Sequence, residues 1–154
     1  MNIRIIITSA LWLLVIATGS GQQKLFDKYA DIDSVQSVYI SKAMFQMIPA
    51  ISDMGLSLTN LTGKLESLQL VSSNRAGLST QMRKDFSQLV TKSHSELMRI
   101  RNGRSRVNVY SEGNGEQLKA LLLLIDSDTA FTVMQILGNF TMKDIQSFAA
   151  EAGN

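Results

Sequence analysis

Four arginines that lie close together in the sequence, Arg99, Arg101, Arg104 and Arg106, have the type and spacing that could bind an anion. Each guanidinium is a planar set of N–H donors that matches the oxygens of a carboxylate or a phosphate. Candidate ligands are a phosphate, a carboxylated glycan, a lipid headgroup or an acidic loop of a partner protein. A site of this kind would require Arg101 and Arg104 to point into one concavity with an apolar wall.

The same arginines have a second interpretation, which the sequence favours. On the predicted elements they span the end of a long helix, a glycine-containing turn and the start of a strand. Cations at a helix C-terminus complement the helix dipole, and cations on an edge strand discourage pairing with other chains. A solvated cluster with no ligand would serve both purposes.

His94 is the only histidine in the chain. It could act as the general base of a hydrolase, with a nearby Ser or Thr as nucleophile and an acidic residue that orients the ring. No G-x-S-x-G pattern accompanies it. Because His94 falls at the edge of the apolar stripe of a predicted helix, the sequence favours a structural role, and we assign no catalytic residue.

The acidic residues and the methionines predict no metal or cofactor site. Asp126 and Asp128 flank Ser127 in a stretch that is typical of a turn. A zinc site needs three or four ligands, and the chain has one histidine and no cysteine. The eight methionines are more typical of core filling than of a copper site.

The start of the chain has the pattern of a secretory signal peptide. Arg4 precedes the apolar run Ile5 to Ile16, and small residues follow from Ala17 to Gly21. We expect residues 1–21 to be a leader, cleaved after Gly19 or Gly21, and residues 22–154 to be one domain. The run is too short for an ordinary membrane span. A buried N-terminal helix or an uncleaved anchor are the alternatives.

Composition and charge limit the classes of partner. The formal net charge of +2 falls to +1 when Arg4 leaves with the leader, so bulk charge gives no support to nucleic-acid binding. Without cysteine the domain cannot form disulfides and must be stabilised by burying a core. We expect no stable membrane span after cleavage.

The elements predicted to position these residues form an α+β fold, a mostly antiparallel sheet with helices packed on one face. The approximate order is β-α-β-α-β-β-β-α. Strands are predicted at 34–41, 65–71, 107–111, 118–125 and 130–137, and helices at 42–48, 80–101 and 142–152. Residues 22–33 are predicted to be a loosely packed lead-in.

Individual segments carry these predictions. The helix Thr80 to Arg101 rests on an apolar stripe at 3–4 spacing, with Ser79 as its N-cap. The continuous apolar run Leu118 to Ile125 is typical of a central strand, although a helix is an alternative, and a hairpin is predicted to join it to the next strand. Thr141 is predicted to cap the last helix.

Three stretches resemble a known family: Phe26-Asp27-Lys28-Tyr29, then Val38-Tyr39-Ile40-Ser41-Lys42-Ala43-Met44, then Thr132 to Ile145. They are similar to an uncharacterised domain-of-unknown-function family of small exported proteins from Gram-negative Bacteroidetes. The resemblance implies a periplasmic or envelope-associated α+β domain. It implies no activity and no catalytic residues.

Together these observations predict a non-enzymatic, exported interaction module of the bacterial envelope, whose partner is a protein, a peptide or a glycan. A protein that binds an anion or a small molecule through Arg99, Arg101, Arg104 and Arg106 is the first alternative. A hydrolase built around His94 is the second.

Overall fold

The computed structural model describes residues 20–47 and 63–152. Residues 1–19 of the predicted leader lie outside these ranges. Pro49, which follows the short predicted helix, also lies outside them. The helices are α2 (Ser20–Ala30), α3 (Lys42–Met47), α4 (Ala76–Ser87) and α5 (Met142–Ala152). The strands are β1 (Gln36–Ser41), β2 (Leu65–Ser73), β3 (His94–Asn102), β4 (Ser105–Asn114), β5 (Gln117–Asp126) and β6 (Phe131–Thr141).

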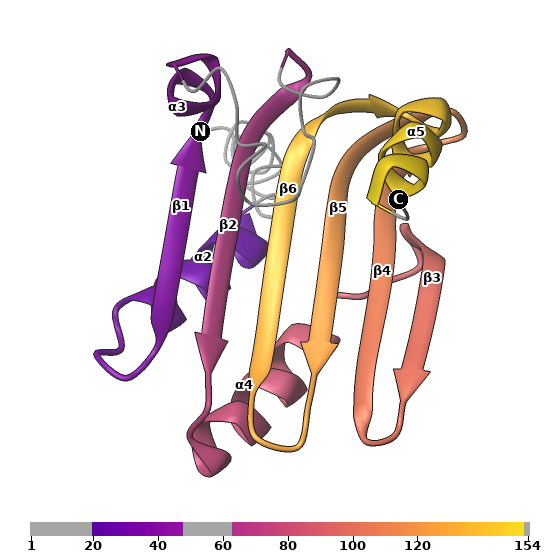
Figure 1. Cartoon of the computed structure of the whole chain (residues 1–154). Helices are drawn as coiled ribbons and strands as arrows, with labels where there is room; N and C mark the ends of the chain where they lie inside the picture. Colours follow the sequence, from indigo (N-terminus) through magenta and orange to yellow (C-terminus); the bar gives the residue numbers. More distant parts are fainter. Residues whose placement is uncertain (1–19, 48–62, 153–154) are drawn as a thin grey trace, which may run out of the picture.

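The six strands of the described residues form one sheet in the order β1-β2-β6-β5-β4-β3, and every neighbouring pair is antiparallel. Figure 1 shows this sheet face-on, with β1 and β3 at its two edges. The predicted α+β fold with an antiparallel sheet is therefore confirmed. The apolar run 118–125 lies in β5, one of the two central strands, and the predicted hairpin joins it to β6.

Helices α2 and α4 cover one face of the sheet, which we call the helix face (Figure 1). Phe26 and Tyr29 of α2 pack against Phe86 of α4, with ring centroids 5.0 and 5.4 Å away. All three residues are at most 1% exposed. Burying large aromatic side chains is a strong stabilising contribution, and edge-to-face contacts add to it.

Helices α3 and α5 contribute to a second apolar cluster near the end of the sheet. Phe45 of α3, Leu65, Leu118 and Phe140 are buried there, and Ile145 of α5 packs against them. Thr141 caps α5, as predicted: its N–H donates to Asp144 Oδ2 at 2.8 Å, and the Asp144 N–H donates to Thr141 Oγ1 at 3.2 Å. This reciprocal pair is a capping box.

The predicted long helix from Thr80 to Arg101 is wrong. Helix α4 ends at Ser87, and the later part of the stretch is the strand β3. The apolar stripe at 3–4 spacing is real from Met82 to Phe86, but residues 98–101 alternate between apolar and basic side chains, which is the period of a strand. The hydrogen bonds between β3 and β4 favour the strand over the helix in this segment.

The predicted N-cap Ser79 is also wrong, because α4 begins at Ala76, with Arg75 at the N-cap position. Ser79 lies inside the helix, where its hydroxyl donates to the carbonyl of Ser73 at 2.8 Å.

The stretch predicted to be a loose lead-in is helix α2. Leu25, Phe26 and Tyr29 follow helical spacing, and they anchor the helix in the main core. Its polar character elsewhere is that of an exposed helix surface.

Candidate functional site

The four predicted arginines lie on the β3–β4 hairpin at one edge of the sheet (Figure 1). The two strands are joined by Gly103 and Arg104, with Asn102 opposite Ser105. Gly103 has a φ of 60°, while no residue other than glycine has a positive φ among the described residues. A two-residue turn with a positive φ only at its first central position is type II′, which matches the twist of the strands. A hairpin therefore stands where the sequence predicts the C-terminus of a helix.

The register of the hairpin brings three of the four arginines together. Arg99 lies opposite Asn108, and Arg101 lies opposite Arg106. Arg106 and Asn108 in turn lie opposite Asp126 and Leu124 of β5. Since Leu124 belongs to the core beneath α2 and α4, these side chains are on the helix face. They occupy the part of that face beyond the two helices.

A hollow of about 230 Å³ is formed at this place. It is lined by Arg99, Ile100, Arg101, Arg106 and Asn108, and we call it the arginine hollow. Arg104 is outside this lining: it sits in the turn, 84% exposed, with Nη1 3.5 Å from Asp128 Oδ2. The expected pairing of Arg101 with Arg104 in one concavity is thus replaced by a pairing of Arg101 with Arg106.

The arginines of the hollow differ in whether an acidic side chain lies beside them. Arg99 Nη2 donates to Glu96 Oε2 at 2.8 Å, and this hydrogen bond lowers the pKa of Glu96 and raises that of Arg99. Arg101 and Arg106, by contrast, face each other directly across the strands. Like charges at directly opposite positions destabilise a pair of strands.

The carboxylate nearest to Arg106 on the next strand is already engaged. Arg83 of α4 donates to both oxygens of Asp126, at 2.8 and 2.7 Å. This bidentate pair raises the pKa of Arg83 and joins α4 to the sheet. Within the ranges 20–47 and 63–152, no ion pair or hydrogen bond of the Arg101 or Arg106 side chain occurs. In this part of the chain, no acceptor competes with an anion for their donors.

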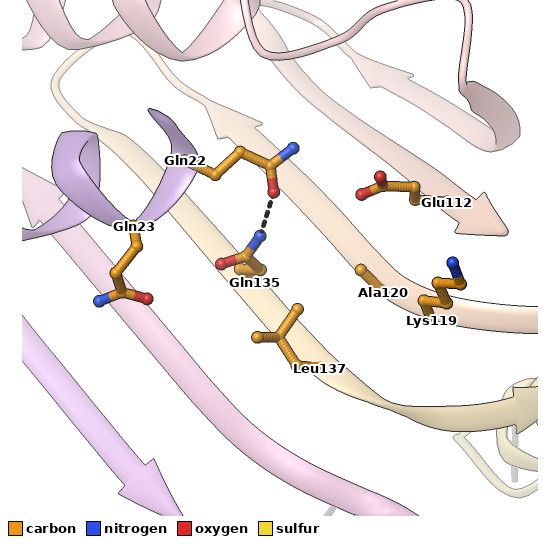
Figure 2. Close-up of a pocket in the computed structure, with 7 residues that line it drawn as sticks. All are labelled: Gln22, Gln23, Glu112, Lys119, Ala120, Gln135 and Leu137. Atoms are coloured by element: carbon orange, nitrogen blue, oxygen red, sulfur yellow. Dashed lines mark hydrogen bonds between the residues drawn. The ribbon is translucent and has the colours of Figure 1, made fainter. Parts of the chain in front are cut away.

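A second hollow, of about 240 Å³, lies on the helix face beside the start of α2. Figure 2 shows its lining: Gln22, Gln23, Glu112, Lys119, Ala120, Gln135 and Leu137. The Gln135 side-chain amide donates to Gln22 Oε1 at 2.7 Å. Its amides and charged groups could bind a polar ligand. Because these residues come from four separate elements, no local pattern in the sequence predicts that they meet.

His94 begins β3 and does not lie on a helix. Its Nδ1 accepts a hydrogen bond from the Thr91 backbone N–H at 3.1 Å, and Nε2 lies 3.7 Å from Glu112 Oε2. The Thr91 hydroxyl is 3.3 Å from the same Nδ1. A hydroxyl and a carboxylate are therefore near the ring, as a hydrolase would need. However, the lone pair of Nδ1 is occupied by the backbone N–H, and the side chain is only 2% exposed. This geometry fits a structural role better than a general base.

The acidic residues near the β5–β6 turn are used in ion pairs and in the turn itself. Asp126 is held by Arg83, Asp128 faces Arg104, and the Ser127 N–H donates to the carbonyl of Ala130 at 2.9 Å. In the described part of the chain, no group of three or more His, Asp or Glu side chains is arranged to hold a metal ion.

Comparison with known proteins gave one match. A family model described as a domain of unknown function, DUF4252, matches residues 29–148. No curated protein and no solved structure matches the chain. Among the described residues, no helix has both the length and the apolar character needed to cross a membrane.

Proposed function

The chain belongs to the domain-of-unknown-function family DUF4252, and we propose that it is a non-enzymatic interaction module that binds an anionic group of its partner in the arginine hollow. One observation carries this proposal: Arg99, Arg101 and Arg106 line one hollow on one face of two paired strands. The anionic group is a carboxylate or a phosphate, whose oxygens match the donor geometry of guanidinium.

The charge arrangement supports binding over a purely solvated cluster. Arg101 and Arg106 repel each other across the strands, and Asp126, the carboxylate opposite Arg106, is bound by Arg83. An anion between Arg101 and Arg106 would replace this repulsion by two charge-assisted hydrogen bonds. The interpretation as cations at a helix C-terminus no longer applies, because these residues lie on strands.

A binding role is also supported by how the candidate catalytic groups are used. The side chain of His94 is buried and accepts a backbone hydrogen bond, while Asp126 is held in a bidentate ion pair. A general base needs a free lone pair that a substrate proton can reach. The alternative of a hydrolase around His94 would require Thr91 and the ring to rearrange.

We further propose that the protein is exported to the envelope of a Gram-negative bacterium. The leader-like pattern of residues 1–21 supports export, and so does the resemblance to an exported family. Cleavage after Gly19 and cleavage after Gly21 both fit this pattern.

The binding function can be tested with a fluorescent tetraglutamate peptide and fluorescence anisotropy. The double variant Arg101→Gln/Arg106→Gln should bind at least tenfold more weakly than the unaltered protein, because two charge-assisted contacts are lost. Arg104→Gln is the matched control, since Arg104 lies on the same hairpin but outside the hollow. Its affinity should stay within about twofold. Equal losses in the two variants would mean that the peptide senses only bulk charge, which would contradict the proposal.

A further inference from the structure

Strand β3 has a free outer side in the described part of the chain. It stands at the end of the strand order and pairs with β4 alone. Its residues from Arg99 to Asn102 are all exposed. An edge strand of this kind presents a row of backbone N–H and C=O groups that can pair with an added strand.

The type II′ turn determines which backbone groups point outward. Such a turn is closed by hydrogen bonding between Asn102 and Ser105. Hydrogen-bonded and non-hydrogen-bonded pairs alternate along an antiparallel ladder. The pairs Arg101–Arg106 and Arg99–Asn108 are therefore non-hydrogen-bonded pairs. Consequently the N–H and C=O groups of Arg99 and Arg101 point away from β4, toward the free edge.

The two sides of β3 have different chemistry along this edge. Arg99 and Arg101 lie on the helix face at the arginine hollow. Met98 and Ile100 alternate with them, so their side chains are on the opposite face, although Ile100 also contributes to the lining of the hollow. Met98 is 43% exposed and Ile100 is 48% exposed. A strand added at this edge would place alternate side chains against the two basic residues and against the two apolar residues.

We propose that the partner group in the arginine hollow belongs to an extended segment of another protein, which adds to β3 as an antiparallel strand. The segment alternates acidic and apolar residues. Its acidic side chains lie opposite Arg99 and Arg101, and its apolar side chains lie against Met98 and Ile100. This inference rests on the proposed function and specifies the partner of the same site. Charge complementarity selects this occupant, since an acidic side chain neutralises Arg101, which has no ion pair among the described residues, while the backbone pairs with the free edge.

A second copy of the chain is a poor occupant of this edge. Antiparallel pairing of two β3 strands would bring the arginines of one copy close to those of the other, and like charges across strands are unfavourable. The register shift between Glu96 and Met98 is a bulge, which confines regular pairing to the segment Met98–Asn102. The added segment therefore needs only four or five residues.

The test uses a fluorescent five-residue peptide of alternating valine and glutamate, blocked at both ends, and two N-methylated versions. In an antiparallel pair, the residues opposite Arg99 and Arg101 form the hydrogen-bonded pairs, so the glutamate N–H groups face β3. N-methylation of both glutamates should weaken binding about tenfold. N-methylation of the valines, whose N–H groups face away, is the matched control and should change affinity by less than threefold.

Equal affinities of all three peptides, or a loss confined to the valine-methylated peptide, would overturn the proposed strand addition. The variant Arg101→Gln/Arg106→Gln, measured with the same peptides, separates the two proposals. If binding depends on the arginines but not on N-methylation, the anion site stands and strand addition is wrong. In sedimentation of the protein alone, we expect no dimer whose formation depends on Arg101. A dimer that the variant Arg101→Gln strengthens or weakens would identify a second copy of the chain as the occupant of this edge.

Discussion

The arginine hollow depends on a conflict between two residues. Arg101 and Arg106 are directly opposite on β3 and β4, where opposite charges would stabilise the hairpin and like charges destabilise it. Binding sites often keep residues that reduce stability, because the same groups bind the ligand. An anion bound between the two guanidinium groups would relieve the repulsion at this pair.

This conflict predicts that Arg101→Gln stabilises the free protein while it weakens binding. Removing one of two like charges at opposite positions should raise the free energy of unfolding by about 0.2–1 kcal/mol at low salt. Urea unfolding measures the difference, and added salt should shrink it because exposed charges are screened. Arg104→Gln is the control, and it should not stabilise, since Arg104 faces Asp128. A lower stability of Arg101→Gln would contradict the proposed repulsion.

At the scale of elements, the sequence predicts most strands and helices but assigns two segments wrongly, residues 80–101 and residues 22–33. Residues 80–101 carry an apolar stripe that is helical in α4 and continues by coincidence through Leu97 and Ile100. The decisive feature is the pairing of Met98–Asn102 with residues of β4, which is a tertiary contact. Helix α2 was missed for a related reason, because only its contacts with Phe86 show that Phe26 and Tyr29 are buried.

The start of α5 predicts how stability depends on pH. Hydrogen bonds from Lys64 and from the Thr141 backbone lower the pKa of Asp144 from 3.8 to about 2. Because the folded-state value lies below the unfolded one, the ionised group stabilises the fold above about pH 4. That contribution disappears as the pH falls from about 4 to 2.

The variant Asp144→Asn tests this dependence through urea unfolding at several pH values. It should be less stable than the unaltered protein near pH 6, and the two should converge toward pH 2. Lys64→Met removes the first cause of the lowered pKa and should show a smaller effect of the same sign. A constant difference across this pH range would contradict the assigned role of Asp144.

At the scale of the whole molecule, the sequence predicts the α+β class and identifies the four arginines as a candidate site. It does not predict which of them line the same hollow. Arg99, Arg101, Arg104 and Arg106 are close in sequence, so their clustering needs no fold. Which of them share a face depends on the register of the hairpin, where a shift of one residue would exchange the faces. The hollow lined by Gln22 and Gln135 lay beyond sequence reasoning, since its residues are far apart in the chain.

Export is a property of the whole chain, and intact-mass spectrometry of the protein from periplasmic fractions of its host tests it. We expect a species that begins at Ser20 or at Gln22, because cleavage after Gly19 or after Gly21 fits the leader pattern. A full-length species in the membrane fraction would contradict cleavage.

The most direct test of the account is an NMR titration that follows the Nε–Hε resonances of the arginines while the tetraglutamate peptide is added. The account predicts saturable shifts, with one common affinity, for Arg99, Arg101 and Arg106, which line the hollow. Arg104 should shift little, although it lies on the same hairpin. If all four arginines shift alike without saturation, or if only residues elsewhere respond, the arginine hollow is not a binding site and the central claim is wrong.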